Sequence, residues 1–126
     1  MPPTIDEVVE RARRRLVRVT PGQAAAELAQ GALVVDIRAE SDRAVEGEIP
    51  GGIVVDRTVL EWRLDPTSPS RLEQAKDHEV RVIVVCAEGY SSSLAAASLQ
   101  DIGLVNATDV IGGFEAWKAA GLPVKA

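Results

Sequence analysis

The sequence has few of the residues on which several classes of protein depend. One cysteine and one histidine among 126 residues exclude an internal disulfide and a zinc site with several cysteine and histidine ligands. Only 3% of the residues are aromatic and the net charge is −5, so the sequence offers neither a base-stacking platform nor the basic surface of a nucleic-acid-binding protein. No apolar run reaches the roughly 18 residues that a membrane span needs.

The remaining composition is that of an ordinary globular domain. Hydrophobic residues make up 46% of the chain and charged residues 26%, and 126 residues suffice for one well-packed core. The first residues are charged where a signal peptide has an apolar block. We therefore expect a cytoplasmic protein with no membrane and no nucleic-acid partner.

Residues 1–16 are predicted to form an N-terminal amphipathic helix in front of the domain proper, residues 17–126. Thr4 and Glu7 have the spacing of a capping box. Apolar residues then recur at intervals of three and four, at positions 5, 8 or 9, 12 and 16. The arginines at positions 11, 13, 14, 15 and 18 are interpreted as a solvated face, with RNA or partner binding as the alternative.

Strand and helix patterns alternate along the rest of the chain. Predicted strands cover residues 16–19, 32–37, 53–55, 80–85 and 109–111. Predicted helices cover residues 23–30, 41–46, 71–77, 91–102 and 114–120, with a short one around Trp62. This alternation is typical of an α/β fold, a parallel sheet with helices on both faces. Trp62 is expected to pack over the core, and His78 to lie at the surface.

Cys86 follows the most hydrophobic predicted strand and precedes a helix by a few residues. Ligands of open α/β sheets bind at this end of the strands. A short loop with a glycine, here Gly89, can turn several backbone amides inward around an anion. Such amides and the positive end of the helix dipole favour the thiolate, the reactive form of cysteine. The placement suggests an activated nucleophile, although a buried structural cysteine fits it equally well.

Four blocks in order make the chain resemble a single-domain rhodanese, a sulfurtransferase-family domain, over about residues 17–124. They are V-V-D-I-R at residues 34–38, G-E-I-P-G-G at 47–52, the strand and cysteine loop at 82–92, and G-G-F through W to G-L-P-V at 112–124. No single block is decisive, and their combination at normal spacing is specific.

The resemblance implies a rhodanese-like fold with a central five-stranded parallel sheet over residues 17–126. It also implies sulfurtransferase chemistry, in which Cys86 takes a sulfane sulfur from a donor, becomes a persulfide and passes the sulfur on. The partners would be a small-molecule sulfur donor and a thiol or protein acceptor, with no metal or organic cofactor. The amides of residues 87–92 would stabilise the anionic persulfide.

The cysteine loop departs from the family pattern. Family enzymes often read C-R-x-G-x-R where this chain has Ala87 and Ser91 at the arginine positions and Glu88 between them. The histidine of the family's I-P-G turn is Glu48 here. Two missing cations and an added anion weaken the attraction for thiosulfate, so weak turnover with thiosulfate is expected. Glu88 is equally well read as a solvated loop residue.

Other residues near the loop are given supporting roles. Tyr90 either walls the mouth of the pocket or packs against the domain. Ser91, Ser92 and Ser93 are expected to cap the next helix, and one of their hydroxyls is a candidate donor to the bound sulfur. Asp36 and Arg38, at the end of a neighbouring strand, are expected to form a structural ion pair near the site.

Two other functions compete with sulfur transfer. A phosphatase of the C-x5-R type needs an arginine six positions after the cysteine, where this chain has Ser92, and no arginine follows Cys86. The second is a rhodanese-like binding or sensor module with little or no catalysis. The missing loop arginines favour this alternative, whereas the retained Cys86 favours the sulfurtransferase.

Overall fold

The computed structural model describes residues 1–126 and is built on a parallel sheet with the strand order β2-β1-β3-β4. The strands are β1 (Leu33–Asp36), β2 (Ile53–Val54), β3 (Val82–Val85) and β4 (Ala107–Asp109). Beside β4, Val19 pairs in parallel with Val110 through one isolated bridge. This bridge stands where the strand over residues 16–19 was predicted, so the fifth strand is reduced to one pairing position.

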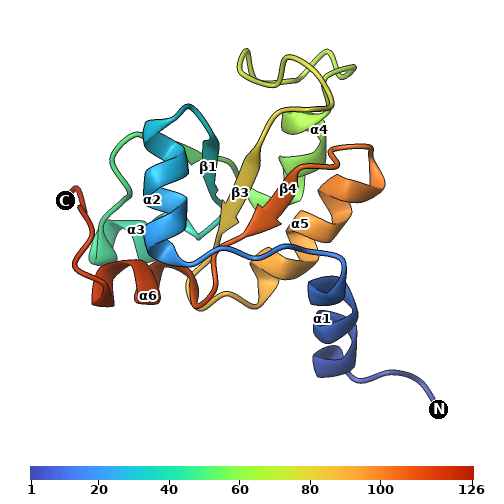
Figure 1. Cartoon of the computed structure of the whole chain (residues 1–126), viewed down its shortest axis with the longest axis horizontal. Coiled ribbons are helices and arrows are strands. Elements are labelled where there is room, and N and C mark those ends of the chain that lie inside the picture. The colour runs from blue at the N-terminus through green and yellow to red at the C-terminus, as the bar shows by residue number, and fades with distance from the viewer.

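Helices cover both faces of the sheet (Figure 1). On one face, α4 (Leu60–Leu64) and α5 (Ser91–Asp101) pack on the core with Val82 and Val84 of β3. On the other, α2 (Pro21–Ala29) and α6 (Gly113–Ala119) pack with Ile83 and Val85. All four valine and isoleucine side chains of β3 are fully buried, as the predicted run of apolar residues requires. The predicted α/β fold is confirmed.

Helix α1 (Ile5–Arg14) lies against α5, and its N-terminal end projects away from the domain (Figure 1). The Thr4 capping box is present. Val9 and Ala12 are buried, and Leu16 beyond the helix joins the core. Ile5, the first residue of the apolar pattern, is 64% exposed.

The segment between β2 and β3 differs most from expectation. It holds a 3₁₀ turn (Arg57–Val59) and α4, and residues 71–77 form no helix, contrary to the prediction. There the guanidinium of Arg71 donates to the carbonyl oxygens of Leu72, Glu73 and Ala75, which in a helix would accept from backbone amides four residues on. Trp62 is 60% exposed, so its predicted core packing is also wrong.

Trp62 is exposed because α4 buries the opposite face, through Leu60 and Leu64 four residues apart. His78 is exposed, as predicted. The remaining elements, including α3 (Glu40–Glu46), lie within two residues of their predicted bounds. None of the helices combines the length and the hydropathy that crossing a membrane requires.

Candidate active site

Cys86 lies directly after β3, in the loop that leads into α5. Its side chain is almost completely buried, with 5% of the residue exposed. Two backbone amides point at the sulfur: Gly89 donates to Sγ at 3.1 Å and Ser92 at 3.3 Å. The loop thus presents amide protons to the sulfur, the arrangement expected for holding an anion. Of the amides of residues 87–92, these two bond to Sγ in the structure.

The start of α6 explains why the loop turns its amides inward. The amide of Phe114 donates to the carbonyl oxygen of Cys86 at 2.8 Å, and that of Glu115 donates to the carbonyl of Ala87 at 3.1 Å. Gly89 has a φ of +87°, and a Cβ there would lie 2.8 Å from the nitrogen of Gly112. Only glycine fits this conformation and this close approach, so the loop sequence and the G-G-F block depend on each other.

The environment of Cys86 lowers the pKa of its thiol. Burial alone raises the pKa, but hydrogen bonds from the hydroxyls of Ser92 and Ser91 and from the amides of Ser92 and Gly89 outweigh it. The Ser92 hydroxyl has a single proton, which it donates to Asp109 at 2.8 Å, so the sulfur and the carboxylate compete for this donor.

The serines do not cap α5, contrary to the prediction. The N-cap position is Tyr90, without a side-chain cap bond. Ser92 and Ser93, both fully buried, instead each donate to Oδ2 of Asp109 at 2.8 Å. Asp109 itself is fully buried at the end of β4. A buried carboxylate requires hydrogen-bond donors, so the hydroxyls of Ser92 and Ser93 bond to Asp109 instead of capping α5.

Two arginines from the N-terminal segment reach the same loop, which the sequence did not predict. Arg13 donates to the carbonyl oxygen of Gly89 at 2.7 Å, and Arg18 donates to the same oxygen at 3.1 Å. Arg13 also donates to Ser93 Oγ at 3.1 Å, and Arg18 holds the Asp109 carboxylate with two nitrogens. The interpretation of these two arginines as a solvated face is therefore wrong. The only feature of the sequence that pointed to them is the lack of arginines in the loop itself, which suggests that cations come from another segment.

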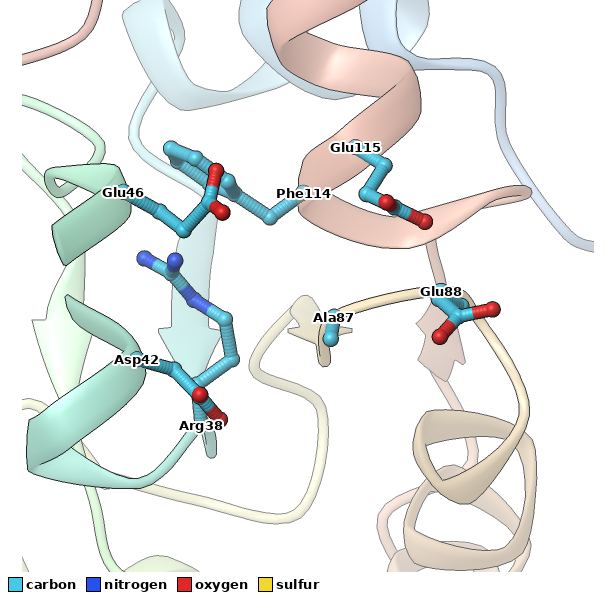
Figure 2. A pocket seen from close by; sticks show the side chains of 7 residues that line it. All are labelled: Arg38, Asp42, Glu46, Ala87, Glu88, Phe114 and Glu115. Atoms are coloured by element: carbon cyan, nitrogen blue, oxygen red, sulfur yellow. The ribbon is translucent and has the colours of Figure 1, made fainter.

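A pocket of about 240 Å³ opens beside the cysteine loop (Figure 2). Its wall contains four carboxylate side chains and one arginine, contributed by β1–α3, the loop and α6. The lining residues are Arg38, Asp42, Glu46, Ala87, Glu88, Phe114 and Glu115. In Figure 2, Asp42 and Glu46 stand with Arg38 on one side, and Glu88 and Glu115 on the other. The pocket is strongly acidic.

The cation in this wall is already neutralised. Nη2 of Arg38 donates to Asp36 at 2.8 Å and to the carbonyl oxygen of Gly47 at 2.7 Å. The guanidinium also lies 3.7 Å from the ring centre of Phe114, and the side chain is only 2% exposed. Asp36 and Arg38 thus form the expected ion pair between the pocket and the core, and the four carboxylates are not offset by this arginine.

The other loop residues lie at the surface. Glu88 is exposed, and Tyr90 is 56% exposed with the Arg13 guanidinium 5.1 Å from its ring centre. Tyr90 thus packs against the N-terminal helix rather than against the domain core. Glu48 accepts a hydrogen bond from Arg43 at 3.1 Å.

The chain is similar in sequence to a known family of domains. The profile of the rhodanese-like domain matches residues 20–120. The chain is 37% identical over 102 residues to thiosulfate sulfurtransferase GlpE of Pseudomonas entomophila, covering 81% of this chain and 84% of the relative. It is 34% identical over 106 residues to GlpE of Haemophilus influenzae, covering 84% and 91%.

Solved structures show the same architecture. A Rhodopseudomonas palustris protein of unknown function, described as a possible tyrosine phosphatase, superimposes with a TM-score of 0.86 at 32% identity, covering 99% of both chains. The polysulfide-sulfur transferase of Wolinella succinogenes shares the fold, with a TM-score of 0.71 at 20% identity over 92% of this chain and 82% of that one. The chain belongs to the rhodanese-like domain family.

Proposed function

We propose that this protein is a sulfurtransferase that carries a sulfane sulfur on Cys86. The observation that carries the proposal is the pair of amides, from Gly89 and Ser92, that donate to the sulfur of the buried Cys86. The GlpE relatives, named thiosulfate sulfurtransferases, support the same reaction class.

The reaction takes place in two displacements at sulfur. The Cys86 thiolate attacks the outer sulfur of a donor such as a persulfide; the S–S bond to the donor breaks, and the donor leaves as a thiolate with the bonding electron pair. The product is a Cys86 persulfide, which becomes an anion when its outer sulfur gives its proton to the leaving thiolate or to water. An acceptor thiolate then attacks the outer sulfur, forms its own persulfide and releases the Cys86 thiolate, so no external oxidant or reductant is consumed.

The lowered pKa of Cys86 increases the share of thiolate, the form that attacks the donor sulfur. Nearby amides stabilise the thiolate before the first step and the persulfide anion after it. The same donors then serve both halves of the cycle.

We further propose that thiosulfate is a poor donor for this chain. The pocket beside the loop is lined by Asp42, Glu46, Glu88 and Glu115, and the loop lacks both family arginines. Exposed charge contacts are each worth up to about 1 kcal/mol, so the loss of two reduces the affinity for a divalent anion by tenfold or more. A donor of lower charge, or the persulfide of a partner protein, fits the pocket better.

The phosphatase activity suggested for the Rhodopseudomonas protein is not favoured by this loop. That chemistry clamps phosphoryl oxygens with an arginine. The arginines that contact the loop, Arg13 and Arg18, are instead bonded to the carbonyl of Gly89, and Arg18 also to Asp109. Neither guanidinium is free to turn toward a phosphate.

The test is mass spectrometry of the intact protein after exposure to thiosulfate, 3-mercaptopyruvate or a polysulfide. We expect a gain of one sulfur atom, largest with polysulfide, smallest with thiosulfate and absent in Cys86→Ala. No gain with any donor would overturn the proposal and favour a binding module. Equal loading by all three donors would overturn the proposed discrimination against thiosulfate.

A further inference from the structure

One carbonyl oxygen of the cysteine loop receives two arginines. The Gly89 oxygen accepts hydrogen bonds from Arg13 at 2.7 Å and from Arg18 at 3.1 Å. This oxygen belongs to the peptide that joins Gly89 to Tyr90. It therefore lies between the two amides, those of Gly89 and Ser92, that donate to the Cys86 sulfur.

Both arginines come from outside the part of the chain that matches the family. The rhodanese-like profile begins at residue 20, whereas Arg13 lies in α1 and Arg18 in the segment after it. The Rhodopseudomonas structure, by contrast, aligns with 99% of this chain. Arg13 thus reaches the cysteine loop from the N-terminal helix, and Arg18 reaches it from the segment that pairs beside β4.

We propose that Arg13 and Arg18 are positioning residues, which fix the Gly89–Tyr90 peptide and so hold the loop amides directed at the Cys86 sulfur. The proposal rests on the proposed function, because the loop it orders is the one that would carry the sulfur. The N-terminal segment then compensates in part for the arginines missing from the loop itself.

The geometry requires an arginine at position 13. Its Nη2 donates to the Gly89 oxygen while its Nε donates to Ser93 Oγ, and the planar group lies over the Tyr90 ring at 5.1 Å. A lysine keeps the charge but cannot make this forked contact. Arg13→Lys therefore separates positioning from simple charge.

The test compares Arg13→Ala and Arg13→Lys with Arg14→Ala, which removes the same charge from an exposed site on the same helix. Arg18 is less suitable for mutation, because its loss also leaves the buried Asp109 carboxylate without its cation. The readout is the pH dependence of Cys86 alkylation, followed by the rate of sulfur loading. The melting temperature of each variant is recorded beside them.

We expect Arg13→Ala to raise the apparent pKa of Cys86 by about 0.5 of a unit and to slow loading about threefold at neutral pH. Arg13→Lys should resemble Arg13→Ala, and Arg14→Ala should resemble the wild type. An Arg13→Ala profile equal to that of Arg14→Ala, or full recovery in Arg13→Lys, would overturn the positioning role. If Arg13→Ala does not fold, Arg13→Lys is compared with Arg14→Ala and the wild type instead.

The alkylation profile does not depend on sulfur transfer. A wild type that never gains sulfur defeats the proposed function, whereas identical alkylation profiles defeat only the role of Arg13.

Discussion

Ser92 donates its hydroxyl proton to the buried carboxylate of Asp109 at 2.8 Å. Its backbone amide donates to the Cys86 sulfur at 3.3 Å. Ser92 therefore contacts both the buried Asp109 carboxylate, which is part of the folded core, and the Cys86 sulfur, which would carry out the chemistry. The two bonds use different groups, so mutation can separate them.

Ser92→Ala should destabilise the protein by about 1–3 kcal/mol, because a fully buried charged group loses a hydrogen bond. The backbone amide remains, so sulfur loading on Cys86 should persist in the folded fraction. Urea denaturation measures the loss. Ser41→Ala is the matched control: its side chain is exposed in α3, away from Asp109 and Cys86, so stability should stay within about 0.5 kcal/mol of wild type. Equal stability of the two variants would contradict the assigned role of Asp109.

Stability should rise with pH in the window between the native pKa of Cys86 and its ordinary pKa. Hydrogen bonds to the thiolate lower the native pKa, so in this window the unfolded chain binds more protons at Cys86 than the native protein does. The free energy of unfolding therefore increases as pH rises through the window, and the added stability is lost as pH falls through the native pKa. Urea titrations of wild type and Cys86→Ala across this range should differ in slope. Parallel curves of unfolding free energy against pH would mean that the fold does not change the pKa of the Cys86 thiol.

Gly89→Ala should be strongly destabilising and should abolish sulfur loading. The residue has a φ of +87°, and the new Cβ would lie 2.8 Å from the backbone nitrogen of Gly112. The strained conformation alone costs about 1–2 kcal/mol, and the loop must shift to relieve the contact. Gly22→Ala is the control: nothing lies within 4 Å of its added Cβ, and it should be neutral or slightly stabilising in α2. The measurements are the melting temperature and the yield of persulfide for each variant. A Gly89→Ala protein that takes up sulfur normally would contradict the predicted clash with the backbone of Gly112.

Glu88→Gln should improve thiosulfate as a donor. Removing one carboxylate from the pocket wall lowers the repulsion of a dianion by up to about 1 kcal/mol, or about fivefold in KM. Glu73→Gln makes the same charge change at an exposed site in the loop before β3 and should leave KM unaltered. Steady-state rates with thiosulfate and cyanide provide the measurement. Identical effects of the two variants would show that net charge matters and pocket charge does not.

The sequence predicted the features that depend on local patterns. Continuous apolar runs gave β1 and β3, and the pairing of Thr4 with Glu7 gave the start of α1. The place of Cys86 after the most hydrophobic strand also followed from pattern alone. These signals are local because each depends on residues a few positions apart.

The sequence could not predict contacts between distant segments. Arg13 meets Gly89 across 76 positions, and Ser93 meets Asp109 across 16. Ser92 and Ser93 carry a capping propensity that the buried Asp109 overrides. At these two serines, tertiary hydrogen bonds outweigh a local preference. Residues 71–77 differ, because there the Arg71 guanidinium bonds to carbonyl oxygens only one to four positions away.

The central claim is that Cys86 not only accepts a sulfur but gives it up. The most direct measurement loads the protein with polysulfide, removes the donor, adds a small acceptor thiol and follows both partners by mass spectrometry. We expect the extra sulfur to leave Cys86 as an equal amount of acceptor persulfide forms, and the freed protein to accept sulfur again. Sulfur that stays on Cys86 in the presence of excess acceptor would contradict it and identify a sensor in place of a transferase.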